Sequence, residues 1–182
     1  GDTATIFVEA DIPSGVDGND IALIDLIATN DDAVAAGDTG ANVSYESNNM
    51  GQVEVDEIPL VGIAKSLGAI TNNSDGTYTF DLTFTIENYG NVALSNLQAT
   101  DDLATAFASA TSWSVDAITS ATLAEYTGFD GDTDQNLLAA TDTLAIGASG
   151  TVVVTVTVEP GSTLTGYTNT AQAEGESPDG DP

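Results

Sequence analysis

Alternation of apolar and polar residues is the dominant pattern of this chain. Across residues 77–87, five apolar side chains, three of them aromatic, alternate with threonine, aspartate and glutamate. Across residues 151–159, valine occupies every second position. A period of two residues predicts β-strands with one buried face. Shorter runs of the same kind predict strands at 61–65, 92–100, 111–118, 141–146 and 166–174.

The pattern predicts an all-β fold. Turn-forming residues separate the runs at 73–76, 89–91, 147–150 and 160–161. A helical period of 3.6 is absent from the sequence, and residues 102–108 allow at most a short helical turn. About seven short strands with turns between them indicate that residues 59–182 form an immunoglobulin-like β-sandwich.

An internal repeat changes the interpretation of the first third of the chain. Residues 1–15 parallel residues 150–161, since both are a glycine turn, an apolar and threonine-rich strand, then proline and glycine. We therefore expect residues 1–58 to be a partial β-domain, the C-terminal part of one repeat or a strand-exchange segment, and residues 59–182 to be the complete next repeat. The missing strands are expected from a neighbouring subunit, which would build a filament, from further chain, or from within residues 1–58 themselves.

Several short motifs support a family resemblance. They lie at residues 63–65, 75–80, 85–91, 94–103 and 169–171. Together they resemble the conserved repeat domain of bacterial and archaeal surface proteins. The resemblance implies immunoglobulin-type sandwiches strung in tandem in large secreted, adhesin-like chains. It therefore implies an extracellular or cell-surface location and a structural role, and the family has no established catalytic activity.

Composition narrows the function classes further. The chain has 29 acidic residues and one basic residue, Lys65, for a formal net charge of −28. Such self-repulsion is relieved by salt or bound cations, so we expect a salty or calcium-containing medium. The partners that we expect, from the repeat rather than from the charge, are other copies of the chain or tandem neighbouring repeats. Nucleic acid is excluded as a partner because phosphate binding needs clustered lysine and arginine. Direct membrane insertion is not expected, because no run approaches the roughly 18 to 20 apolar residues of a span.

The absence of cysteine and histidine removes most catalytic chemistry. Disulfides, thiolate nucleophiles and the usual general base all need residues that this chain lacks. An enzyme is therefore not expected. Two other function classes remain open: a module that binds a carbohydrate or protein ligand on a cell surface, and a hydrolase built on two carboxylates.

One acidic segment has the spacing of a calcium loop. Oxygen-bearing side chains alternate at Asp130, Asp132, Asp134 and Asn136, which is how calcium loops converge their ligands. Gln135 stands where an EF-hand requires glycine. The loop is therefore either a calcium site of another kind or a solvated acidic turn.

The only cation is the centre of the most specific hypothesis. Lys65 lies in the first predicted strand of the complete repeat and Asn169 in its last, and such strands can be neighbours in sandwiches of this kind. Some surface-protein sandwiches join such a pair by an intramolecular isopeptide bond, with a buried carboxylate assisting. Asp101 is the candidate assistant. The alternative is an ordinary exposed lysine beside an acidic residue.

Weaker motifs complete the list of candidate sites. The triplet at residues 38–40 matches that of aspartic proteases, but a single copy favours an ordinary turn. Asn42 and Asn72 begin glycosylation sequons, which predict surface loops where glycans could attach.

Overall fold

The chain divides into two units, Gly1–Asp56 and Glu57–Pro182, close to the boundary expected from the repeat. The computed structural model describes residues 21–25, 50–54, 57–162, 166–178 and 180. In the first unit, β1 (Ile21–Asp25) pairs antiparallel with β2 (Met50–Glu54). The Asn42 sequon and the triplet at 38–40 lie outside the described residues.

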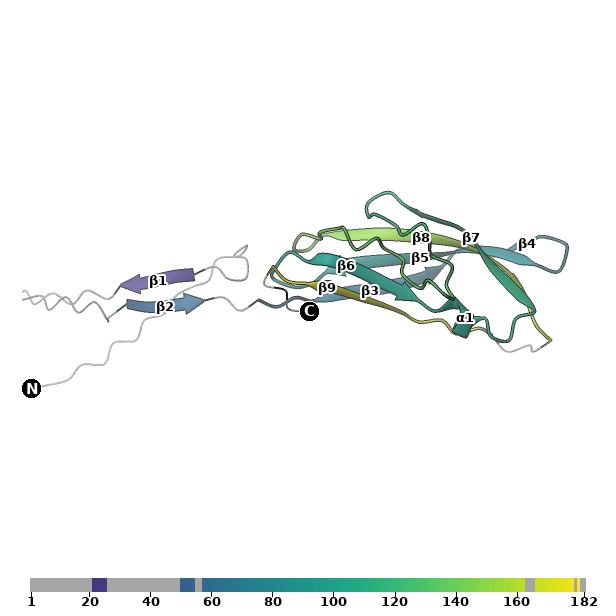
Figure 1. Cartoon of the computed structure of the whole chain (residues 1–182), viewed down its shortest axis with the longest axis horizontal. Helices are drawn as coiled ribbons and strands as arrows, with labels where there is room; N and C mark the ends of the chain where they lie inside the picture. The colour runs from purple at the N-terminus through teal and green to yellow at the C-terminus, as the bar shows by residue number, and fades with distance from the viewer. Residues whose placement is uncertain (1–20, 26–49, 55–56, 163–165, 179, 181–182) are drawn as a thin grey trace, which may run out of the picture. The chain divides into compact units, whose positions relative to one another are not determined.

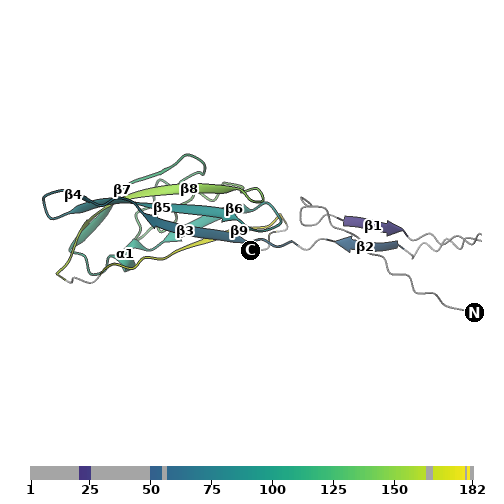
Figure 2. The same cartoon turned by 180° about the vertical axis from the view of Figure 1, so that it is seen from behind.

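The larger sheet of the second unit is antiparallel throughout. Its strands lie in the order β3, β5, β8, β7 (Figures 1 and 2). A short strand, β4, pairs with the first residues of β5. The bounds are β3 Val61–Leu67, β4 Thr71–Asn72, β5 Tyr78–Asn88, β7 Ser112–Ser120 and β8 Ser149–Glu159. The two runs with the clearest alternation are strands, as predicted, and the structure places them at the centre of this sheet as β5 and β8.

A smaller sheet is formed by β6 (Ser95–Asp101) and β9 (Ala171–Glu176), which pair antiparallel. The single-turn helix α1 (Leu103–Ala106) follows β6, where the sequence allowed a short helical turn. No helix in the part of the chain that the structure describes is long and apolar enough to cross a membrane.

Three sequence predictions of strands need correction. The strand expected at 92–100 begins at Ser95. Residues 141–146 form no strand and make one isolated bridge, between Leu94 and Leu144. The carboxylate of Asp142 in this segment accepts the backbone N–H of Ala124 at 2.7 Å, so side-chain bonding partly takes the place of a ladder. The last strand begins at residue 171 rather than 166.

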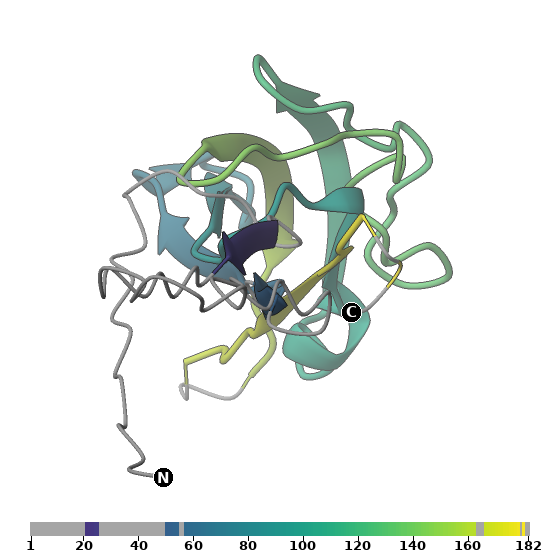
Figure 3. The same ribbon diagram turned by 90° about the vertical axis from the view of Figure 1, so that its left-hand side faces the viewer.

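The core lies between the two sheets and draws on alternate residues of both. The inward valines of β8 are 0–2% exposed, and they pack with buried residues of β5 and β6. Each large apolar side chain that leaves water here contributes roughly 1.5–3 kcal/mol. Figure 3 views this arrangement end-on, with β8 in yellow-green and β9 in yellow. The all-β fold that the alternation predicted is therefore present, and the structure shows that its sheets are antiparallel.

Candidate functional site

Lys65 occupies a core-facing position of β3. It follows Val61 and Ile63 at intervals of two residues, and in the ladder it stands directly opposite Phe84 of β5. Its side chain is only 15% exposed, and Nζ lies 5.0 Å from the centre of the fully buried Phe84 ring. The only lysine of the chain is therefore drawn into the edge of the core, unlike an ordinary exposed surface lysine.

Asp101 ends β6 on the same inward face as Leu97 and Ala99. Its side chain is completely buried, and Oδ2 accepts a hydrogen bond from Lys65 Nζ at 2.8 Å. The other oxygen, Oδ1, is buried and has no hydrogen-bond partner among the described residues. A buried carboxylate oxygen without a donor disfavours the ionised form of the group.

Asn169 completes a group of three side chains around one oxygen atom. Its Nδ2 donates to Asp101 Oδ2 at 3.0 Å, so this oxygen accepts hydrogen bonds from both Lys65 and Asn169. Asn169 does not lie in the last strand, as the sequence suggested, but in the irregular segment 166–170 that leads into β9. Because β3 and β9 are in contact, the first and last strands of the unit meet at this site.

Burial shifts the proton affinities of the charged pair toward each other. Burial raises the pKa of Asp101, against the opposing hydrogen bonds and charge of Lys65. Burial likewise lowers the pKa of Lys65, although its bond to Asp101 acts in the opposite direction. Both shifts favour moving a proton from the ammonium to the carboxylate, which produces a neutral amine beside a carboxylic acid.

The loop at residues 130–136 braces the end of β6. Gln135 accepts the backbone N–H of Asp101 at 3.0 Å, and Gly131 accepts that of Ala104 at 3.0 Å. Asp102 caps the helix α1 through Thr105 N at 2.8 Å. These bonds fix the backbone on both sides of the buried carboxylate.

The residues proposed for calcium form a hydrogen-bonded turn. Asp130 Oδ1 accepts the backbone N–H groups of Asp132 and Asp134 at 2.9 and 2.8 Å, and these bonds lower the pKa of Asp130. Asn136 lies apart, in a bridge to Thr100. Among the described residues, no three acidic, histidine or cysteine side chains are grouped so that they could hold a metal ion. The structure therefore does not bring the three carboxylates together.

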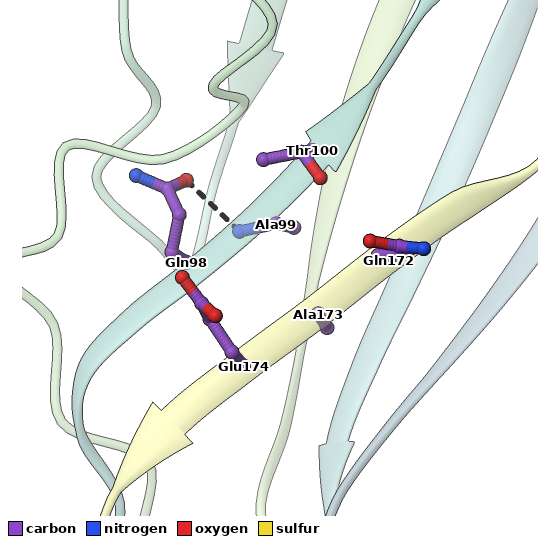
Figure 4. A pocket seen from close by; sticks show the side chains of 6 residues that line it. All are labelled: Gln98, Ala99, Thr100, Gln172, Ala173 and Glu174. Atoms are coloured by element: carbon purple, nitrogen blue, oxygen red, sulfur yellow. Dashed lines mark hydrogen bonds between the residues drawn. The ribbon is translucent and has the colours of Figure 1, made fainter. Parts of the chain in front are cut away.

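A polar hollow of about 270 Å³ lies on the surface of the smaller sheet (Figure 4). Its lining side chains are Gln98, Ala99, Thr100, Gln172, Ala173 and Glu174. The Gln98 amide is already bound to the backbone of Leu138, from which Oε1 accepts and to which Nε2 donates. The lining includes no aromatic ring on which a sugar could stack, so the hollow does not favour the carbohydrate-binding alternative.

The Asn72 sequon falls on an exposed hairpin. Asn72 lies in β4, where Oδ1 accepts the N–H of Ser74 at 2.8 Å. The position is open to solvent, as a surface sequon requires.

Three residues that support the site were not identified from the sequence. The ring of Phe84 lies next to the Lys65 amine, and the backbone carbonyl of Gln135 accepts the N–H of Asp101. Tyr167, two residues before Asn169, packs against the ring of Phe107. Phe84 had a detectable signal, since the alternation already placed it on the buried face. Gln135 acts through its backbone carbonyl, which no residue-type pattern reveals.

Comparison with known proteins found no relative of this chain. No protein-family model matches the chain, and neither a curated protein nor a solved structure matches it. The arrangement of Lys65, Asp101 and Asn169 is therefore the feature of the molecule that points to a function.

Proposed function

We propose that this chain is an extracellular structural module of a cell-surface protein or filament, closed by an isopeptide bond between Lys65 and Asn169. A single observation carries the proposal: the amine and the amide both donate to Oδ2 of the buried Asp101, at 2.8 and 3.0 Å. Two groups held on one buried atom are pre-positioned for an intramolecular reaction.

Proton transfer within the pair is the first step. The ammonium of Lys65 gives a proton to Asp101, which leaves an uncharged amine with a free lone pair. Burial assists this transfer because neither charge is well solvated there. The Asn169 amide then turns its Oδ1 toward the Asp101 acid, which polarises the amide carbonyl by hydrogen bonding.

Bond exchange at Asn169 is the second step. Lys65 Nζ attacks Cγ, an Nζ–Cγ bond forms, and the Cγ–Nδ2 bond breaks. Asp101 passes one proton to the departing nitrogen and takes one from Nζ, so ammonia leaves and the acid is regenerated. The reaction occurs once in each chain and needs no cofactor, so the protein is not an enzyme in this proposal.

The bond would suit a surface module that lacks disulfides. The chain contains no cysteine, and an amide between β3 and the segment before β9 would tie the two ends of the unit together without redox chemistry. Pulling force applied at both ends would pass through the bond rather than through the sheets. The motifs that resemble those of surface repeats support an immunoglobulin-like identity, tandem arrangement and surface location. Filament formation by strand exchange with residues 1–58 stays a prediction.

Trypsin tests the bond directly because this chain has one basic residue. An unmodified chain, denatured and digested, separates into residues 1–65 and 66–182. A chain whose Lys65 carries the isopeptide bond stays whole, because trypsin needs a free lysine side chain. Its intact mass should also be lower than the sequence mass by one ammonia.

Variants of the three residues provide the controls. Asn169→Ala and Asp101→Ala should have the full sequence mass and should be cut by trypsin. In the wild type, chemical cleavage at Trp113, the only tryptophan, should leave the two pieces joined, because it lies between the bonded residues. A folded wild-type chain that has its full mass and is cut at Lys65 would show that the bond does not form.

A further inference from the structure

We infer that Tyr167 is the positioning residue that holds the Asn169 amide at the Lys65 amine. The inference depends on the proposed cross-link and identifies which residue makes it fast. Lys65 and Asp101 lie in strands whose ladders fix their backbones. Asn169 lies in residues 166–170, which belong to no strand. Two residues after Asn169, Ala171 pairs with Asp101 at the start of β9, so the ladder holds this segment on one side only. Tyr167, two residues before Asn169, is placed to hold the other side.

The Tyr167 ring anchors this segment to the core. It meets the Phe107 ring edge-on, with centroids 5.3 Å apart and an angle of 76° between the planes. Aromatic pairs of this geometry contribute stabilisation beyond the area that they bury. The Tyr167 hydroxyl also accepts the backbone N–H of Gly161 at 3.3 Å. Only Thr168 separates this anchored ring from Asn169.

Phe107 provides a rigid base for the anchor. It is 5% exposed and follows α1 directly, six residues after Asp101 in the chain. Its ring also contacts Phe80 of β5 and Trp113 of β7, at 6.3 and 5.9 Å. The contact between Tyr167 and Phe107 therefore fixes the segment that carries the amide against the same part of the fold that carries the Asp101 carboxylate.

Rate rather than final yield is the expected consequence. An intramolecular attack depends on holding the reacting atoms within a near-attack geometry, and a misplacement of about 1 Å lowers such rates by about 100-fold. Loss of the Tyr167 ring should leave the sheets and the core residues intact but free the amide to leave Asp101. The bond should then form slowly.

Newly made full-length chain allows the rate to be measured. The wild type, Tyr167→Phe and Tyr167→Leu are produced by cell-free translation, and the loss of ammonia is followed by intact mass over time. We expect Tyr167→Phe, which retains the ring, to match the wild type closely, and Tyr167→Leu to react about 100-fold more slowly. Tyr89→Ala, which removes an exposed ring at the other end of β5, should react at the wild-type rate.

Folding is checked by circular dichroism and by the fluorescence of the single tryptophan. A folded Tyr167→Leu chain that reacts at the wild-type rate overturns the inference. If that variant does not fold, Thr168→Gly decides, because added backbone freedom between anchor and amide should slow the reaction roughly two- to fivefold; an unchanged rate there overturns it equally. A wild type that loses no ammonia instead overturns the cross-link itself, and this separates the two failures.

Discussion

At the scale of single residues, Lys65 and Asp101 are charged side chains in core-facing positions. Each continues the inward series of its own strand, after Ile63 and after Ala99. Burying an ion pair costs desolvation energy that attraction repays only with good geometry. Here one carboxylate oxygen is also without a donor among the described residues. The pair is therefore poorly suited to be a stabilising salt bridge and well suited to proton transfer.

The pKa shifts predict a bell-shaped pH dependence for the cross-linking rate. The reactive pair holds one proton, on Asp101. At low pH the pair takes a second proton, the amine stays charged, and the cross-linking rate falls. Because the pKa of Asp101 is raised, this fall in rate begins at a higher pH than it would for an ordinary aspartate. At high pH the pair loses its one proton, no acid remains at Asp101, and the rate falls again. Because the pKa of Lys65 is lowered, this second fall occurs at a lower pH than that at which an ordinary lysine titrates.

The initial rate of ammonia loss, measured by intact mass across a pH series, checks this profile. Asn169→Ala serves as the blank, since it has no reactive amide. A rate that rises continuously into the ordinary range of lysine titration would contradict a shared proton between the two residues.

At the scale of elements, the loop at residues 130–136 is hydrogen-bonded to the last residue of β6, from Asp101 N to the carbonyl of Gln135. Gly131 has φ of +73°, a left-handed conformation that favours glycine. A Cβ added there would lie 2.7 Å from Leu103 Cδ1, a buried side chain of α1. The loop therefore combines a backbone requirement with close packing directly beside the carboxylate.

Gly131→Ala should destabilise the unit by about 1–3 kcal/mol, through strain at positive φ together with crowding of Leu103. Denaturant unfolding in an Asn169→Ala background measures this without the cross-link. Gly76→Ala is the matched control, because Gly76 also has positive φ but nothing lies within 4 Å of its added Cβ. Equal losses at the two glycines would show that contact with Leu103 does not contribute.

At the scale of the whole molecule, the proposed bond would close a loop that contains most of the second unit. Lys65 lies in its first strand and Asn169 just before its last, so the strands from β4 to β8 lie within the loop and β9 lies outside it. A covalent closure of this length restricts the unfolded chain strongly, as a disulfide does. The bond would therefore stabilise the fold without adding a contact to it.

Asn169→Ala should consequently lower the free energy of unfolding by about 5 kcal/mol. It leaves the Lys65–Asp101 pair in place, so the loss reports mainly on the bond. Thermal and denaturant unfolding give the measurement, and Asn72→Ala, at an exposed position of β4, is the control. A stability equal to that of the wild type would mean that the loop is not closed.

Local pattern alone was sufficient for the central strands and for the buried valines of β8. The side chains of a strand alternate between faces wherever it pairs, so the period of two is a local property. Residues 141–146 show the limit of that signal, because a short alternating run becomes a strand only if a neighbour is available for pairing. The structure instead gives this segment one bridge, at Leu144, and a side-chain bond from Asp142.

The sequence by itself determined the all-β class, the extreme negative charge and the identity of Lys65 as the only amine-bearing side chain. Only the tertiary structure decided that Lys65 and Asn169 converge on Asp101, across separations of 36 and 68 residues from that carboxylate. The reason is that the three residues belong to different elements, on two sheets and an irregular segment. Their meeting depends on how β3, β6 and β9 pack together, and this packing is not encoded in any local period.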